Sequence, residues 1–247
     1  MLTPVVGPHG TSTVNEEDLL RCADIAEKHQ IPITIHSSET RDDVLKSETN
    51  HGVPPVEWLD SIGFFRENVP AIIAHCTWIT QREVEIIAKH KGIVGWCPVS
   101  GQKLAYGGVA PVPELRSKGA TVALGTDGPA SNNTLDLFRE MREASNLISQ
   151  DRWDPSIYPV EHVVYDTCFS LRDYFIPKTN IKVGNIADLC ILNFHKPHLT
   201  PSNWNIVSHI VYACNGSDVD SLIVNGKVLM LSLIHISEPT RPLYISY

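Results

Sequence analysis

The sequence of 247 residues has no long apolar run, and none of its hydrophobic stretches approaches the ~18–20 residues that a membrane-spanning helix needs. The first residues, Met1 to Pro4, are not a basic stretch followed by an apolar core, so no signal peptide is recognised. These two absences predict a protein that does not bind a membrane, with the cytoplasm as its location.

Paired cysteines and an excess of positive charge are also missing. The six cysteines are widely spaced without any Cys-x-x-Cys pair, which favours a reduced interior over a disulfide framework or a zinc ribbon. The formal net charge is −8, with scattered acidic residues, which argues against binding to nucleic acid. With 43% hydrophobic and 19% charged residues, the composition is that of an ordinary globular protein.

Strand-like and helix-like segments alternate through the first part of the chain. The expected strands cover 30–36, 71–75, 92–97 and 121–127. Helices are expected after the capping-box patterns at 13–16 and 80–83, and over 112–118 and 133–148. This alternation is typical of a parallel α/β sheet, either doubly wound or closed into a barrel.

The position of the polar residues favours the barrel. His36, His75 and Asp127 each stand at the end of an expected strand. Because side chains alternate across a strand, Thr34 shares a face with His36, while branched apolar residues such as Ile35 occupy the other face. Reactive groups at the carboxyl ends of parallel strands, with branched residues packed under helices, are the pattern of a (β/α)8 barrel.

The predicted pattern of helices and strands changes beyond about residue 180. Strands are expected over 184–192 and 219–228, the second with an Asn-Gly turn at Asn225, so 184–230 is predicted to be a small β-rich unit beside a barrel segment of 1–183. Residues 231–247 resemble a translated sequencing adapter and are predicted to be a non-native tail.

Each candidate site residue has an ordinary alternative explanation. His36-Ser-Ser-Glu39 occurs by chance in many sequences, His75 alone resembles a hydrogen-bonded core histidine, and an aspartate before glycine, as at Asp127, is often a turn former. The three residues nevertheless end equivalent parallel strands, where independent coincidence is a poor explanation. Because imidazole and carboxylate groups bind zinc and iron, the joint interpretation is a metal site.

A specific resemblance follows from motifs that occur in a fixed order. They are Pro8-His9-Gly10, His36-Ser-Ser-Glu39-Thr40, Ala74-His75-Cys76, Cys97-Pro98-Val-Ser100 with Lys103-Leu104, Leu124-Gly-Thr-Asp127-Gly128 with Ser131-Asn-Asn133, and Gly184-Asn-Ile-Ala-Asp188-Leu. Together they resemble the amidohydrolase superfamily, closest to the methylthioadenosine/S-adenosylhomocysteine deaminases and their triazine-hydrolase relatives.

The resemblance implies a role for each matched residue. His36 and Asp127 would bind a divalent metal, with zinc expected and iron as the alternative. Glu39, His75 and Asp127 would be catalytic: Glu39 moves a proton to the substrate ring, and His75 orients the hydrolytic water. His9, Glu39 and Ser131 would contact the substrate.

One family feature is missing. The family's first strand carries a His-x-His pair, and no His-x-His occurs in this sequence. By the resemblance, His36 belongs to the fifth strand and Asp127 to the eighth, so we expect a truncated, partial barrel of about strands four to eight, with feeble metal affinity and no activity of its own. Gly101 also departs from the family, which usually has asparagine there.

Three functions stay open. The first is hydrolytic deamination of an adenine-type nucleoside (methylthioadenosine, S-adenosylhomocysteine or adenosine) with release of ammonia. The second is hydrolysis of a triazine, guanine or a cyclic amide, and the third is an inactive, metal-free fragment. The expected partner is a small-molecule nucleoside, with no nucleic acid and no membrane, and the subunit number is left open, a homo-oligomer included.

Overall fold

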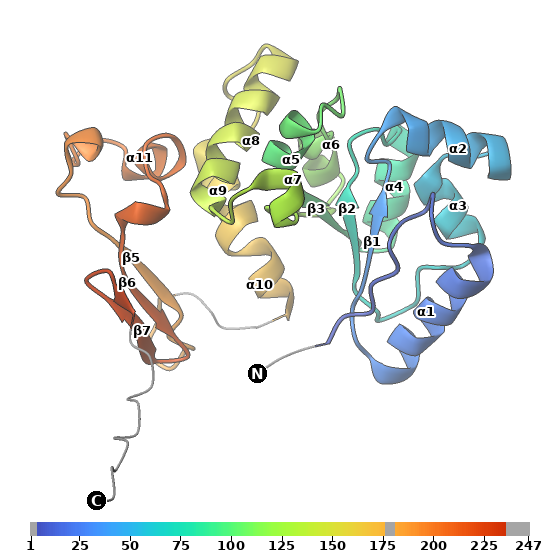
Figure 1. The fold of residues 1–247 in the computed structure, drawn as a ribbon, viewed down its shortest axis with the longest axis horizontal. Helices are drawn as coiled ribbons and strands as arrows, with labels where there is room; N and C mark the ends of the chain where they lie inside the picture. The colour runs from blue at the N-terminus through green and yellow to red at the C-terminus, as the bar shows by residue number, and fades with distance from the viewer. Residues whose placement is uncertain (1–3, 176–180, 236–247) are drawn as a thin grey trace, which may run out of the picture.

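The computed structural model describes residues 4–175 and 181–235 and contains two sheets, each of four strands. Figure 1 shows a parallel sheet flanked by helices and a second sheet beside it. The elements of the first part are α1 (Glu16–His29), β1 (Ile33–Ser37), α2 (Arg41–His51), α3 (Pro55–Ser61), β2 (Ala71–His75), α4 (Gln81–Lys89), β3 (Ile93–Trp96), α5 (Pro98–Lys103), α6 (Val112–Ser117), β4 (Thr121–Leu124), α7 (Pro129–Asn132), α8 (Leu137–Arg152), α9 (Val160–Cys168) and α10 (Ser170–Phe175).

The parallel sheet follows the order of the chain, β1-β2-β3-β4. Its pairs are all parallel, with Ile35 opposite Ile73 in the first pair. An extended segment before α1 runs along β1, where Val6 and Gly10 form parallel bridges. The α/β fold with a parallel sheet is therefore confirmed, and all carboxyl ends of its strands lie at one edge.

Helices pack against this sheet through buried apolar residues that recur at helical spacing and so lie on one side of each helix. In α4, the Thr80 side chain accepts from the Glu83 amide in a capping box, and Val84 and Ile87 are buried. The main core gathers residues from β2, β3, β4 and the helices α4, α6, α8 and α9, while a second cluster lies between α1, β1 and α3. Burial of these apolar groups is the main favourable contribution to folding.

The second sheet is antiparallel, in the order β5-β6-β7-β8. Its elements are β5 (Leu189–Leu192), η1 (Pro197–Leu199), α11 (Ile206–Tyr212), η2 (Gly216–Asp218), β6 (Val219–Val224), β7 (Lys227–Leu231) and β8 (Ile234–His235). The β6–β7 hairpin turns at Asn225 and Gly226, with φ of 49° and 76°. Both residues have the positive φ that a tight hairpin turn requires.

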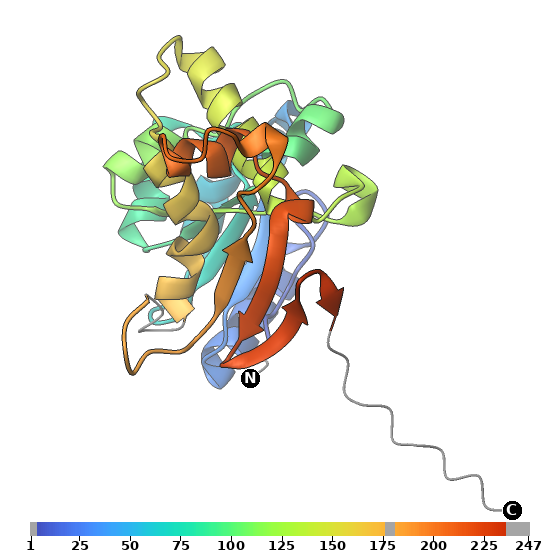
Figure 2. The same ribbon diagram turned by 90° about the vertical axis from the view of Figure 1, so that its left-hand side faces the viewer.

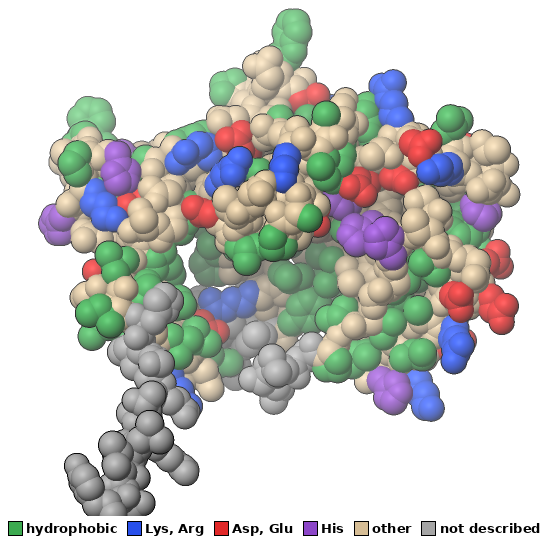
Figure 3. Space-filling model, in the orientation of Figure 1, with side chains coloured by type: hydrophobic (Ala, Val, Ile, Leu, Met, Phe, Trp, Pro, Cys, Tyr) green, Lys and Arg blue, Asp and Glu red, His purple; other side chains and the backbone are tan. Residues whose placement is uncertain are grey.

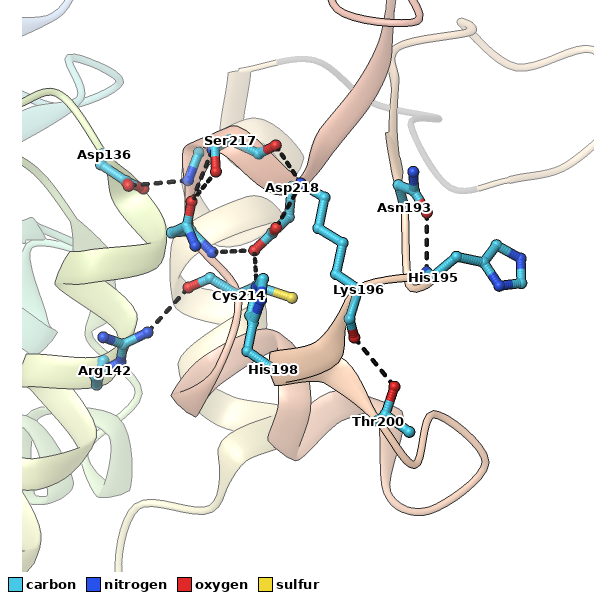
Figure 4. Close-up of polar contacts among 12 residues, drawn as sticks. Asp136, Arg142, Asn193, His195, Lys196, His198, Thr200, Cys214, Ser217 and Asp218 are labelled. Carbon is cyan, nitrogen blue, oxygen red and sulfur yellow. Dashed lines mark hydrogen bonds and ion pairs between the residues drawn. The ribbon is translucent and has the colours of Figure 1, made fainter.

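The second sheet is joined to the first part through α8 and α11. Figure 2 shows its strands in front of the helices, and the close-up in Figure 4 shows the polar contacts at the junction. Asp136 accepts from the Gly216 amide at 2.9 Å, Arg142 donates to the Cys214 carbonyl at 3.1 Å, and the hydroxyls of Ser145 and Tyr212 lie 2.5 Å apart.

Several expected elements differ in extent from the observed ones, and α1 is capped by Asn15 instead of the capping box expected at 13–16. The helix expected over 133–148 is α8, Leu137–Arg152, because Asn133 ends α7 with a left-handed backbone and Asp136 caps α8. The strand expected over 184–192 is reduced to β5, since Gly184 has φ of 90° and only Leu189–Leu192 pair with β6. Residues 236–247 of the predicted tail lie outside the described residues. Among those described, no helix is long and apolar enough to cross a membrane.

Candidate metal and catalytic site

Three predicted residues meet at the carboxyl edge of the parallel sheet. His36 lies in β1, His75 is the last residue of β2, and Asp127 follows β4 by three residues. One ligand atom from each lies within 4.8 Å of the others. The rings of His36 and His75 are stacked with centroids 5.3 Å apart, and Figure 3 shows histidine side chains gathered next to acidic ones on this face.

The backbone at this edge is held in an uncommon conformation. His75, Cys76 and Asp127 have φ of 70°, 52° and 58°, and Ser38 has φ of 51°. A positive φ is unfavourable for residues other than glycine and persists only where neighbouring contacts impose it. For example, the Cys76 amide donates to the Ser37 carbonyl at 3.2 Å, which links β2 to β1. This geometry sets the direction in which the site side chains leave the strands.

The Asp127 carboxylate is held in its ionised form. The Ser100 hydroxyl donates to Oδ2 at 2.7 Å, and the Gly128 amide donates to Oδ1 at 2.8 Å. Burial alone would raise the pKa of Asp127, but these two hydrogen bonds and the neighbouring imidazoles of His75 and His36 outweigh it, so that the pKa lies below its ordinary value. An ionised carboxylate is the form that ligates a cation.

The His75 imidazole is kept neutral. Burial lowers the pKa of His75, the nearby His36 lowers it further, and Glu39 and Asp127 oppose the effect in part. Its Nε2 lies 3.9 Å from Oε1 of Glu39, and its Nδ1 is buried without a hydrogen-bond partner among the described residues. A buried imidazole nitrogen without a partner is costly in a polar cluster unless a ligand satisfies it.

His36 is oriented by the segment that precedes α1. Its backbone amide donates to the His9 carbonyl at 3.1 Å, and its Nδ1 donates to the same oxygen. Because a carbonyl can only accept, Nδ1 carries the proton and Nε2 keeps a free lone pair. A ligating histidine is commonly oriented in this way by a carbonyl on its other nitrogen.

The donor set fits a divalent metal. Two imidazoles and one ionised carboxylate are ligands that suit zinc and iron, and a set of three protein ligands is the number found in many catalytic zinc sites. The unpartnered Nδ1 of His75 and the short distances between ligand atoms support this fit.

The other predicted residues lie around this cluster. Glu39 is half-buried beside His75, and the His9 ring lies 5.1 Å from that of His36, with its Nδ1 2.8 Å from the Thr13 hydroxyl. Ser131 lies in α7, where its amide donates to the Gly128 carbonyl at 3.0 Å. Within the described part of the chain, the Ser131 hydroxyl forms no hydrogen bond with the three candidate ligands.

Two further residues belong to the site but were not among its predicted members. Ser100 contacts Asp127, and the Tyr106 hydroxyl lies 3.1 Å from the Ser100 hydroxyl. Burial and a hydrogen bond to Glu39 raise the pKa of Tyr106, whose ring meets His75 edge-on at 5.5 Å. Ser100 follows the end of β3, so the strand-end rule could have found it. Tyr106 lies in an irregular loop, and nothing in its local sequence marks it.

Comparison with known proteins decides the family. A sequence model of the amidohydrolase family matches residues 1–229. The chain belongs to the amidohydrolase family. This confirms the resemblance found in the motifs.

Relatives of this amidohydrolase include two nucleoside deaminases. It is 40% identical over 230 residues to 5'-deoxyadenosine deaminase of Methanothrix thermoacetophila, covering 93% of this chain and 54% of the relative. It is 42% identical over 228 residues to 5-methylthioadenosine/S-adenosylhomocysteine deaminase of Thermococcus onnurineus, covering 92% of this chain and 53% of the relative. The chain thus spans about half the length of these relatives.

Solved structures share the fold. A zinc-bound adenosine deaminase from Xanthomonas campestris superposes with a TM-score of 0.88 at 28% identity, over 94% of this chain and 52% of that one. Atrazine chlorohydrolase from Arthrobacter aurescens, with zinc and atraton, gives a TM-score of 0.83 at 18% identity, over 94% of this chain and 51% of that one. The second likeness supports the fold alone.

Proposed function

We propose that this amidohydrolase chain forms part of a metal-dependent deaminase that hydrolyses the exocyclic C–N bond of an adenine-type nucleoside and releases ammonia. The observation that carries the proposal is the convergence of His36, His75 and Asp127 at one edge of the sheet. The names of the deaminase relatives favour an adenine-type nucleoside, such as methylthioadenosine, S-adenosylhomocysteine or adenosine, as the small-molecule substrate.

The proposed architecture is a partial (β/α)8 barrel, about strands four to eight, over 1–183, with 184–230 as a segment of a β-rich domain and 231–247 as a non-native tail. The sequential strand order and the helices between the strands support the barrel. The parallel bridges from Val6 and Gly10 to β1 support a further strand position on that side.

His36, Asp127 and His75 would hold the metal, and zinc is favoured because the adenosine deaminase of similar structure has zinc bound. When bound, a divalent cation supplies positive charge that makes a water molecule easier to deprotonate near neutral pH. Asp127 is ionised, since its pKa lies below the ordinary value, and its carboxylate is therefore available to accept the proton of the attacking water.

Glu39 is proposed to carry a proton to the purine ring nitrogen while the C–N bond breaks. It is half-buried, next to His75 and hydrogen-bonded to Tyr106, so it faces the cluster without being one of the three candidate ligands. His75, whose predicted role is to orient the hydrolytic water, lies among the candidate ligands and next to Glu39. His9 and Ser131 are proposed to contact the nucleoside.

The activity is tested on the protein from the complete gene, by ammonia release from a panel of adenosine derivatives, guanine and triazines. We expect turnover of at least one adenine-type nucleoside, and its loss by about a thousandfold in Glu39→Gln, as expected for a general acid–base group. Turnover of guanine or a triazine alone would favour the second class of substrate.

Metal binding is tested on the chain itself by titration with cobalt(II), followed by its visible absorption. We expect a weak, saturable signal that disappears in Asp127→Ala. A chain that binds no cobalt at millimolar concentration would instead support a metal-free fragment.

A further inference from the structure

A buried carboxylate outside the candidate site connects two of the loops that form it. Glu140 lies in the first turn of α8 and is fully buried. Its Oε2 accepts from the Val99 amide at 3.0 Å, and its Oε1 accepts from Nδ2 of Asn132 at 2.6 Å. The same Asn132 nitrogen donates to the carbonyl of Thr126 at 2.7 Å.

The residues that Glu140 and Asn132 contact directly precede residues of the candidate site in the chain. Val99 precedes Ser100, whose hydroxyl donates to Asp127, and Thr126 precedes Asp127 itself. The helix α5 begins after Cys97, which gives no side-chain cap, so that Glu140 supplies from another helix the acceptor that the N-terminus of α5 lacks. One carboxylate therefore ties the start of α5 to the loop after β4.

We propose that Glu140 is a positioning residue that fixes the distance between Ser100 and Asp127 and so sets the orientation of the Asp127 carboxylate. The inference rests on the proposed function, because it concerns the same site. The role requires that both oxygens of the Glu140 side chain accept a hydrogen bond, since both neighbours, the Val99 N–H and the Asn132 amide nitrogen, are donors.

The decisive variant is Glu140→Gln, which keeps the size of the side chain but replaces one acceptor oxygen by a donor nitrogen. A glutamine can accept from Val99 or from Asn132, but not from both. If Asn132 flips to accept from it, the Asn132 oxygen faces the Thr126 carbonyl and that bond is lost instead. Every arrangement thus breaks one link of the connection.

The chain offers a matched control in Glu83. It is also fully buried, and it accepts from the Val56 amide at 3.0 Å and the Thr80 amide at 2.7 Å, neither of which adjoins a candidate ligand in the chain. Burial raises the pKa of both Glu83 and Glu140. Glu83→Gln therefore reproduces the general cost of replacing a buried, doubly bonded glutamate.

The test is amide hydrogen exchange of the metal-free chain. In Glu140→Gln we expect exchange in 97–104 and 125–134 to accelerate about tenfold, the effect of losing one hydrogen bond to a charged group. In Glu83→Gln, acceleration should be confined to 54–58 and 80–84. Asn132→Ala should accelerate 125–134 but leave 97–104 unchanged, because the bond from Val99 to Glu140 persists.

Exchange in Glu140→Gln that changes equally over the whole chain, or only within α8, would overturn the proposal. A second measurement links the connection to the site: cobalt affinity should fall about tenfold in Glu140→Gln and stay unchanged in Glu83→Gln. If the parent chain binds no cobalt, the proposed metal site fails while the exchange pattern still decides the role of Glu140. Equal cobalt affinity in both variants would contradict it.

Discussion

At the scale of single residues, the candidate site depends on neighbouring groups that form hydrogen bonds with the candidate ligands and keep them in place. Asp127 is flanked by the donors Ser100 and Gly128, and His36 is oriented by the His9 carbonyl. Such contacts keep a carboxylate ionised and an imidazole in one tautomer before any ligand arrives. Substitutions of these neighbours should therefore affect the site without removing a ligand.

Ser100→Ala is the simplest example. Loss of the hydrogen bond to Asp127 should lower the free energy of unfolding by roughly 2 kcal/mol and raise the pKa of Asp127. Urea unfolding and a carboxyl-carbon NMR titration measure the two effects. As a control, Ser117→Ala removes an exposed hydroxyl that donates only to the Glu114 carbonyl. An unchanged Asp127 pKa would contradict the assigned hydrogen bond.

Asp218 gives a prediction for pH. The hydrogen bonds from Lys196, His198 and the Asn215 amide outweigh the effect of burial, so the pKa of Asp218 lies below its ordinary value of 3.8. A lowered folded-state pKa means that the stabilisation is present above pH 3.8 and is lost as the pH falls through the folded-state value.

We therefore expect the stability of the parent chain to fall more steeply below pH 4 than that of Asp218→Asn, which carries no titrating group there. Urea midpoints measured from pH 6 to pH 3 test this expectation. Parallel curves for the two proteins would show that Asp218 does not contribute to the acid dependence.

At the scale of elements, caps and turns explain where helices begin and end. Thr80 with Glu83 begins α4 as the capping-box pattern predicts, and Asn225-Gly226 forms the predicted hairpin turn. The sequence pattern did not reveal the role of Asp136, which both caps α8 and accepts from Gly216 of η2, because the second contact joins residues 80 positions apart.

Asp136→Ala should lose both contacts. We expect a loss of about 1 kcal/mol for the cap and about 1 kcal/mol for the bond from Gly216. Asn15→Ala is the matched control. Asn15 caps α1 by accepting from the Asp18 amide at 2.9 Å, and its side chain also donates to the Asp18 carboxylate, so both bonds stay within the first turn of α1. Equal losses of unfolding free energy in the two variants would contradict a role for Asp136 at the junction.

At the scale of the whole molecule, the sequence predicted the parallel sheet, three residues at its carboxyl edge and a second β-rich unit. These features follow from local periodicity and from the rule that parallel strands end at one edge. It could not predict Tyr106 or Glu140 as parts of the site region, because their partners come from distant elements and their local sequences resemble ordinary loop and helix. Long-range packing decided both.

Shortening the chain after Leu231 tests the predicted tail. Among the described residues, those after Leu231 add the strand pairs of Met230 with His235 and of Leu231 with Ile234, and hydrogen bonds from the Ser232 and Leu233 amides to Ser221 and Asp220. We expect the thermal midpoint of the shortened chain to stay within about 2 °C, since the described residues after Leu231 make few contacts. A larger decrease would show that the segment after Leu231 contributes to the folded structure.

The left-handed backbone at His75, Cys76 and Asp127 has a consequence for attempts to improve this protein. Glycine at any of these positions would relieve about 1 kcal/mol of conformational cost. At Asp127, however, glycine would also lose the hydrogen bonds from Ser100 and Gly128, and at His75 and Cys76 it would leave a cavity in place of a buried side chain, so that the fold would lose stability. The contacts that offset the backbone strain are those that place the candidate ligands, so a screen for heat tolerance alone would tend to keep these residues.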